Sequence, residues 1–352
     1  MSGTLSRRQL LRRGLTLGGA ALLAPAALSA CVSGTDGPAG STDGLGVASQ
    51  RLAWLMNAQF VGSYVAEDRG YYREEGFSGS EIVSGGPTAA PIESDVLERT
   101  FAGVSQVPIV GAAVAQGAPL KIVGAVYQRY AGCIVSMADS PIRSLEDLRG
   151  KTIGCSSSSE PVWRNFLASM DLNDQQISTV PVQGDPIAMT TGEFDGYLGF
   201  LNNQPIDLRV KGFDVETMLL ADVGFRLPGQ TYIVKQEDLD AEPEKVKAFL
   251  RAEIRGWNDA LADPEMALDI TLNNYGAGLG LDPEATAEAL RVQTELIRST
   301  DGAQHVGLLT DAQARESAAA VTRGGLDVSA ETLFDLGPIT EIYAEEPALR
   351  VA

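Results

Sequence analysis

The sequence is poor in the residues that enzymes most often use for catalysis and metal binding. Histidine occurs once, at His305, and cysteine occurs three times. A site with several histidine ligands, or a Ser-His-Asp triad, therefore has little material to draw on, and we expect no metal and no cofactor. Basic residues are also scarce, with 27 against 46 acidic ones and a formal net charge of −19. Such an acidic chain is poorly suited to binding nucleic acid.

The N-terminal apolar stretch, residues 15–28, is weak and shorter than the ~20 residues that span a bilayer. A basic head precedes it, and Leu28-Ser29-Ala30-Cys31 follows, which resembles the lipobox of lipoprotein signals. We therefore expect residues 1–30 to be a removed signal peptide and Cys31 to carry a lipid anchor on the bacterial cell membrane, outside the cytoplasm. Ser6-Arg7-Arg8-Gln9-Leu10-Leu11 resembles a twin-arginine export signal; general secretion is the alternative route.

After Cys31 the composition changes to Gly, Ser, Thr, Asp and Pro without periodicity. This pattern predicts a flexible tether over residues 31–49, with a reach of roughly 20–25 Å. The anchor lipid would be the only contact with the membrane. The rest of the chain is long enough for one two-lobed unit or two compact domains.

From Arg51 onward, short apolar runs alternate with helical patterns, which predicts an α/β fold. Strands are expected at 51–56, 80–85, 100–105 and 120–127, with helices 62–75, 88–99 and 107–116 between them. A second such unit begins near Gly132, and the chain after Asp238 is largely helical. We expect a two-lobed clamshell with C-terminal helices, whose lobes are 51–131 plus 222–352 and 132–221. A cleft between two such lobes suits a small molecule.

Several short motifs occur in an order that resembles one family of binding proteins. They are Trp54–Ala66, Gly70-Tyr71-Tyr72, Glu75-Gly76-Phe77, Ser84–Pro87, Phe101–Ser105, Ala115–Pro119, Tyr127-Gln128-Arg129, Ser144–Lys151 and Gly256-Trp257. Over residues 51–270 they resemble the family that binds thiamine pyrimidine precursors, which is related to sulfonate, taurine and nitrate binders. The resemblance implies a type II periplasmic-binding-protein fold and a monomer that serves an ABC permease and its ATPase.

The first half of the expected site is aromatic. Trp54, Phe60 and Tyr64 fall at a strand end and a helix start, where rings can stack on a planar heterocycle. Core packing is the alternative for these rings. Asn57 and Gln59 offer donor and acceptor groups beside them, and Asn57 stands where the family carries Asn. Tyr127 lies in one of the matching motifs.

The second half is polar. Ser105 precedes a helix, where free backbone N–H groups can bind a carbonyl or an anion, or simply cap the helix. Residues 156–159 supply hydroxyl groups, of which Ser157 is the one assigned to the site. Glu160 lies in a loop where the family carries Glu; it would accept hydrogen bonds from an amino group, or else favour the helix dipole. Asn203 and Gln204 follow a strand at the cleft edge, where the family places a polar contact; a plain loop is the alternative.

The ligand expected first is formylaminopyrimidine or hydroxymethylpyrimidine, and riboflavin would use the same features. Sulfonate, taurine or nitrate would call for a cation, for which Arg129 is the nearest candidate. A lipoprotein sensor is a further alternative. A pyridoxal-phosphate-consuming pyrimidine synthase resembles this family but carries His where Phe60 stands, together with a cysteine-rich motif. Here only Cys133 and Cys155 follow the tether, either as a disulfide or as buried thiols.

Overall fold

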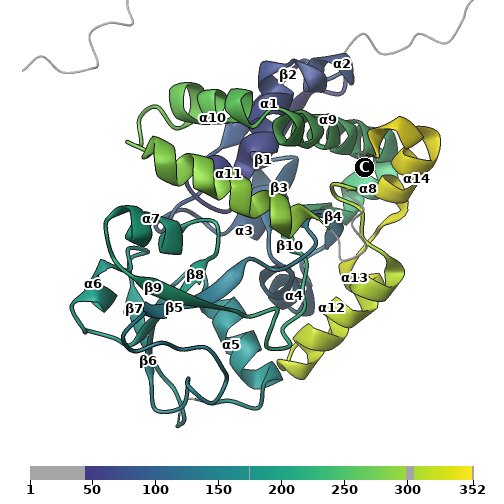
Figure 1. Ribbon diagram of the computed structural model, residues 1–352. Helices are drawn as coiled ribbons and strands as arrows, with labels where there is room; N and C mark the ends of the chain where they lie inside the picture. Colours follow the sequence, from purple (N-terminus) through teal and green to yellow (C-terminus); the bar gives the residue numbers. More distant parts are fainter. Residues whose placement is uncertain (1–43, 174, 299–304, 351–352) are drawn as a thin grey trace, which may run out of the picture. The chain divides into compact units, whose positions relative to one another are not determined.

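The structure is a computed structural model that describes residues 44–173, 175–298 and 305–350 (Figure 1). The expected signal peptide, Cys31 and most of the expected tether lie outside the described residues. The described residues belong to one compact unit. Within them, no helix has both the length and the apolar composition needed to cross a membrane.

The first sheet, sheet A, has five strands in the order β2-β1-β3-β10-β4. β1 pairs in parallel with β2 and β3, whereas β10 is antiparallel to both β3 and β4. Every residue of β4 except Lys121 is buried, as in strands covered on both faces. The strand bounds are β1 Val47–Arg51, β2 Gly79–Val83, β3 Ala102–Ser105, β4 Leu120–Tyr127 and β10 Gly229–Lys235.

The second sheet, sheet B, has five strands in the order β7-β6-β8-β5-β9. β6 is parallel to β7 and β8, and β5 is antiparallel to β8 and β9, so the pairing pattern repeats that of sheet A. The bounds are β5 Gly132–Met137, β6 Thr152–Ser156, β7 Ser178–Val182, β8 Gly196–Phe200 and β9 Val215–Leu219.

The chain passes between the sheets twice, and each passage leads into the antiparallel strand of the sheet it enters. Residues 128–131 connect β4 to β5, and residues 220–228 connect β9 to β10. The expected α/β class with two chain crossings is therefore confirmed. The lobe boundaries at 131/132 and 221/222 stay a prediction, because the described residues cluster as one unit.

Helices cover the sheets and form most of the C-terminal third (Figure 1). Several begin with Pro in the first turn, where its missing N–H costs nothing; α4, α5, α9 and α11 are examples. The α-helix bounds are α1 Val61–Asp68, α2 Tyr71–Glu74, α3 Ile92–Glu98, α4 Val107–Ala115, α5 Glu160–Ser169, α6 Ile187–Thr190, α7 Gln204–Val210, α8 Gln236–Ala241, α9 Pro243–Ala262, α10 Pro264–Ile270, α11 Pro283–Ile297, α12 Asp311–Arg323, α13 Ala330–Leu333 and α14 Gly337–Glu345. The other helical segments are η1 Ala58–Phe60, η2 Thr271–Tyr275 and η3 Pro347–Leu349.

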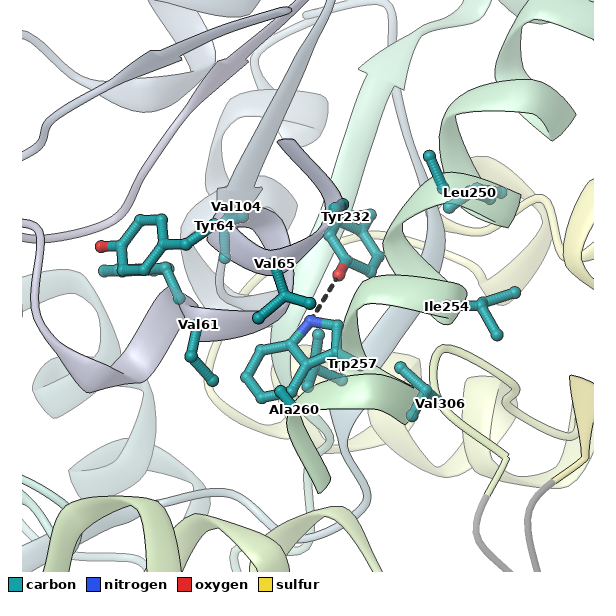
Figure 2. Packing of buried hydrophobic residues seen from close by; sticks show 14 of the residues in the cluster. Val61, Tyr64, Val65, Val104, Tyr232, Leu250, Ile254, Trp257, Ala260 and Val306 are labelled. Atoms are coloured by element: carbon teal, nitrogen blue, oxygen red, sulfur yellow. Dashed lines mark hydrogen bonds between the residues drawn. The ribbon is translucent and has the colours of Figure 1, made fainter. Parts of the chain in front are cut away.

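α1 and α9 pack so closely that their contact requires glycine. A Cβ atom on Gly62 would lie 2.3 Å from the Trp257 ring, and one on Gly256 would lie 2.1 Å from the carbonyl oxygen of Gly62. Figure 2 shows Trp257 packed beside Val65, with its Nε1 donating a hydrogen bond of 3.0 Å to the hydroxyl of Tyr232. This contact fixes the position of α1, the helix that follows β1 and the cavity-lining residues after it.

A buried carboxylate lies next to this contact. Glu253 is fully buried and accepts hydrogen bonds from Ser63 Oγ at 2.9 Å, from Tyr232 OH at 2.7 Å and from Tyr72 OH. Burial raises the pKa of Glu253, and the three hydroxyl donors oppose that shift. The cluster joins α1, α2, α9 and β10 through polar contacts inside an apolar core.

The beginning of the fold differs from the expectation. Val47–Ser49, expected in the tether, form the start of β1, whereas residues 52–56, the greater part of the strand expected at 51–56, lie in an irregular segment that leads into η1. β1 lies between β2 and β3, so its backbone is paired on both edges. Of the apolar side chains that follow it, Leu52 is buried, Trp54 faces a cavity and Leu55 is exposed. The expected helix 62–75 is also divided, at Gly70, whose φ is 77°.

Candidate functional site

The carboxyl ends of four strands, two from each sheet, meet around one cavity, the main cavity. Ala53 and Trp54 follow β1, Gln106 follows β3, and Ser156 and Phe200 end β6 and β8. β1 and β6 are the strands in their sheets with parallel neighbours on both sides. In α/β sheets, ligands bind outside the carboxyl ends of the strands at this kind of position.

The lining of the main cavity carries no formal charge. Its apolar residues are Ala53, Trp54, Ile92, Ile109, Leu198 and Phe200, and its polar residues are Gln59, Gln106, Ser156, Ser158, Ser159, Tyr197, Asn203 and Gln204. The space in which the centre of a water molecule fits is about 60 Å³. An apolar surface with a few neutral hydrogen-bonding groups is typical of a small-molecule site.

Trp54 reaches across from the sheet A side to the sheet B side. A Cβ atom placed on Gly184 would lie 3.1 Å from Cη2 and 3.3 Å from Cζ2 of its indole ring. Gly184 lies between β7 and α6 with φ of 98°, and its carbonyl accepts a hydrogen bond of 3.1 Å from Tyr197 OH. The ring therefore borders the cavity and also contacts the opposite wall.

Four amide side chains supply most of the hydrogen-bonding capacity. Gln106 accepts a hydrogen bond of 2.6 Å from Tyr130 OH, and Gln204 accepts one of 2.8 Å from the Phe200 N–H, which leaves the NH₂ group of each available. The side chains of Gln59 and Asn203 make no hydrogen bond with the residues that the structure describes. Amides present both donors and acceptors, as recognition of a heterocycle edge requires.

The segment after β6 contributes hydroxyl groups. Ser156 Oγ lies 3.1 Å from Ser158 Oγ and donates to Ser159 Oγ at 3.0 Å. All three line the main cavity, immediately before α5. Ser157, the serine singled out from the sequence, is exposed and does not line it.

A second, smaller cavity of about 10 Å³ lies where the chain crosses between the sheets and shares part of its lining with the main cavity. Ser105 and Tyr127 line it. Ser105 Oγ donates a hydrogen bond to Glu93, a carboxyl group whose pKa is raised by burial. Tyr127 OH donates to Gln293 Oε1 at 3.1 Å and accepts from Asn202 Nδ2 at 3.0 Å. Both residues are nearly fully buried.

Phe60 and Tyr64 lie in the hydrophobic core and line neither cavity. Tyr64 stacks on Tyr275 with ring centroids 4.2 Å apart, and burial raises its pKa well above the ordinary value. Figure 2 shows Tyr64 with Val61 and Val65 on α1, among the core residues. The packing alternative weighed for these two rings is the one that the structure shows.

Asn57 and Glu160 have local partners. Asn57 Oδ1 accepts a hydrogen bond of 3.0 Å from the Gln59 N–H and so caps η1. Glu160 is exposed at the start of α5, and its Oε1 accepts from Arg164 Nε at 2.9 Å and Nη2 at 2.6 Å. Neither lines the main cavity. Their part in binding stays a prediction without support from the cavity.

The remaining expectations concern residues away from the main cavity. Arg129 pairs with Asp222 at 2.5 Å outside it. Cys133 and Cys155 are buried free thiols, and burial raises the pKa of each to about 12. Among the described residues, no group of three or more His, Cys, Asp or Glu side chains is placed to hold a metal ion.

The sequence predicted Gln59 as a hydrogen-bonding group beside the aromatic rings, and it lines the main cavity, but the side chains of Gln106 and Tyr197 were missed. Gln106 follows the Ser105 that we singled out, and Tyr197 lies in a strand that carried no motif. Only the folded chain brings Tyr197 to the same cavity as Trp54.

Comparison with known proteins agrees with the fold and identifies the family of the chain. Residues 57–267 match the family model described as NMT1/THI5 like. Riboflavin-binding protein RibY of Chloroflexus aurantiacus is 30% identical over 261 residues, which cover 71% of this chain and 70% of that protein. The formylaminopyrimidine-binding protein of Halalkalibacterium halodurans is 24% identical over 287 residues, which cover 80% and 86%.

Among solved structures, the periplasmic aliphatic sulphonate binding protein SsuA of Escherichia coli is similar with a TM-score of 0.61 at 14% identity. The likeness covers 80% of this chain and 94% of that one, and it confirms the expected periplasmic-binding-protein fold. The family match covers more than half of the sequence and includes most of the main-cavity segments. The chain belongs to the NMT1/THI5-like family.

Proposed function

We propose that this protein is the solute-binding component of an ABC importer and captures a neutral, planar nitrogen heterocycle in the main cavity. The observation that carries the proposal is the lining: one indole ring, four amide side chains and several hydroxyls, with no charged side chain. Buried amides and hydroxyls must find partners, and a heterocycle edge supplies both donors and acceptors. The indole ring adds apolar contact with the ring face.

The same lining argues against sulfonate, taurine or nitrate. A buried anion needs a cation or several converging N–H groups. Arg129, the cation considered for this role, is half-buried and paired with Asp222 outside the cavity. We therefore place anionic ligands last.

A thiamine pyrimidine precursor is our first candidate, as in the formylaminopyrimidine-binding relative. Riboflavin is the second, because the 30% identical relative is a riboflavin-binding protein. The volume of the main cavity distinguishes the two candidates. The cavity has about 60 Å³ of room in this conformation, so a single ring requires less opening than the three fused rings of a flavin.

The proposed mechanism is capture and delivery without chemistry. The ligand binds between the strand ends of the two sheets, and the closed form docks on a membrane permease driven by an ATPase. A lipid on Cys31 would hold the protein outside the cytoplasm near that permease. Metabolic labelling with a fatty acid, compared between the natural chain and Cys31→Ser, tests the anchor separately from ligand binding.

Calorimetry on a protein that begins after Cys31 tests the ligand. The panel is hydroxymethylpyrimidine, formylaminopyrimidine, riboflavin, taurine and nitrate. We expect a pyrimidine to bind, and we expect Trp54→Ala to weaken binding about tenfold or more, because it removes a buried ring contact. Asn203→Ala should weaken it by about three- to tenfold through one lost hydrogen bond.

Leu97→Ala is the matched control, since Leu97 is 37% exposed and lines neither cavity. Glu160→Ala measures the expectation made from the sequence, and the ion pair with Arg164 predicts no change in affinity. Binding of only taurine or nitrate would refute the heterocycle proposal. Unchanged affinity in both Trp54→Ala and Asn203→Ala would refute the assignment of the cavity.

A further inference from the structure

Gly184 is placed so that its lack of a side chain affects the main cavity. It lies in the connection between β7 and α6, on the sheet B side, and Trp54 approaches it from the sheet A side. A methyl group at this position would lie 3.1 and 3.3 Å from two atoms of the indole ring, closer than ordinary van der Waals contact. The Trp54 ring would have to move by a few tenths of an ångström to accept it.

Two features hold the backbone of Gly184 in place beneath the ring. Its φ of 98° is in the left-handed region, which favours glycine. Its carbonyl accepts the hydrogen bond from Tyr197, a buried residue of β8 that also lines the main cavity. Tyr197, a residue of the main cavity, therefore fixes the position of the backbone that Trp54 approaches.

Gly192 shows that the left-handed backbone alone does not explain Gly184. It belongs to the same part of the chain, after α6, and has φ of 82°. A Cβ atom on Gly192 would meet nothing within 4 Å. The two glycines share the backbone requirement, and Gly184 alone of the two adds a contact with Trp54.

We propose that Gly184 is a ligand-positioning residue. The Trp54 indole ring packs against its backbone, which carries no side chain. This contact sets how closely the two sides of the main cavity approach each other over a bound ring. The inference rests on the proposed function, because it assumes that a ligand occupies this cavity. A side chain at residue 184 would keep the Trp54 ring away from the backbone of that residue. It would thereby loosen the contact between the indole ring and a thin planar ligand.

The test compares Gly184→Ala with Gly192→Ala, which carry a similar backbone cost. With the ligand found for the natural sequence, we expect Gly184→Ala to weaken binding about tenfold, as one misplaced methyl group does in a tight site. Gly192→Ala should stay within about twofold of the natural sequence. Unfolding midpoints of the two variants show whether their stabilities are matched. Equal affinity in the two variants would overturn the proposal.

A second measurement needs no ligand. Trp163 and Trp257 are each 1% exposed, so acrylamide quenching of tryptophan fluorescence reports mainly on Trp54, with Trp54→Phe as the blank. Gly184→Ala should make Trp54 more accessible to the quencher than Gly192→Ala does. If no member of the panel binds the natural sequence, the proposed function fails for that panel. The quenching comparison then decides the Gly184 contact by itself, and equal quenching would reject it.

Discussion

The three tryptophans have different surroundings, and these separate core residues from a candidate ligand contact. Trp163 and Trp257 are each 1% exposed and donate hydrogen bonds to Thr179 and Tyr232. A buried indole whose N–H is satisfied inside the protein is typical of a structural role. Trp54 is half-buried and lines the main cavity. The degree of burial and the hydrogen-bond partners therefore distinguish Trp54 from the other two tryptophans, which residue type alone does not.

The sequence identified part of the cavity lining. Trp54, Asn203 and Gln204 were singled out and do line it. Phe60 and Tyr64 were equally plausible by type, but their four-residue spacing places them on one face of a helical segment, and that face is covered by the core. Which face is covered depends on α9 and on Tyr275, far along the chain, so the local pattern could not decide it.

Glu253 gives a pH-dependent prediction at the scale of one residue. Its pKa is raised in the folded protein, so the folded state binds a proton more tightly than the unfolded chain does. Stability from this group therefore increases as pH falls toward the ordinary Glu value of 4.5 and decreases as pH rises through the folded pKa. Glu253→Gln should remove this dependence. Urea unfolding should be measured between pH 5 and 8. As pH falls, the free energy of unfolding of the natural sequence should rise relative to that of the variant, by up to about 1.4 kcal/mol per pH unit.

Glu288→Gln is the control for Glu253. The ion pair with Arg291 lowers the pKa of Glu288, so its contribution has the opposite sign and is lost as pH falls. Because that pair is on the surface, the effect is small. A natural sequence and a Glu253→Gln variant with parallel stability profiles over this pH range would contradict the assignment of a raised pKa to Glu253.

At the scale of elements, the interior strands were easier to predict than the segments near the cavity. β4 has the expected bounds, 120–127, because an unbroken apolar run of strand length has one ready interpretation. β1 starts earlier and ends earlier than expected, since Gly and Ser hid its start and the apolar residues after Arg51 turn toward the cavity. Residues 202–205 are expected to end a strand, with a plain loop as the alternative, but Gln204–Val210 is helical.

The contact between α1 and α9 gives an element-scale prediction. Replacing Gly by Ala inside a helix normally stabilises it by up to about 1 kcal/mol. Gly256→Ala should do the opposite, because the new methyl group would lie 2.1 Å from the Gly62 carbonyl and 2.8 Å from Ala66. Since backbone atoms cannot rotate away, the helices must separate. We expect a loss of about 3 kcal/mol or more in the free energy of unfolding.

Gly111→Ala in α4 is the matched control for that variant. Its Cβ would meet Leu326, Val321 and Val328 at 3.5–3.9 Å, which is ordinary contact. This change should be neutral or stabilising in the same denaturant titration. If Gly256→Ala were as stable as Gly111→Ala, the close approach of α1 and α9 would be wrong.

For the whole described body, one apolar cluster continues from the sheet A side to the sheet B side. It contains Ile122 and Val107 from the first and Trp163 and Phe166 from the second, together with Val321 of α12. Asn165 Nδ2 donates a hydrogen bond of 3.0 Å to the Val321 carbonyl across this junction. The two sheets therefore share this part of their apolar core.

This continuity predicts one unfolding transition for the protein that begins after Cys31. Differential scanning calorimetry should give a calorimetric enthalpy equal to the van't Hoff enthalpy, because losing either sheet exposes the shared cluster. A ligand bound between the sheets stabilises that single transition as a whole, by about 2.7 kcal/mol at a free concentration of 100 times Kd. Two resolved transitions, or a ligand that moves only one of them, would mean that the sheets fold separately and that the shared cluster contributes little. A single transition whose midpoint rises with ligand concentration would show that the ligand binds the folded protein, whose two sheets unfold together.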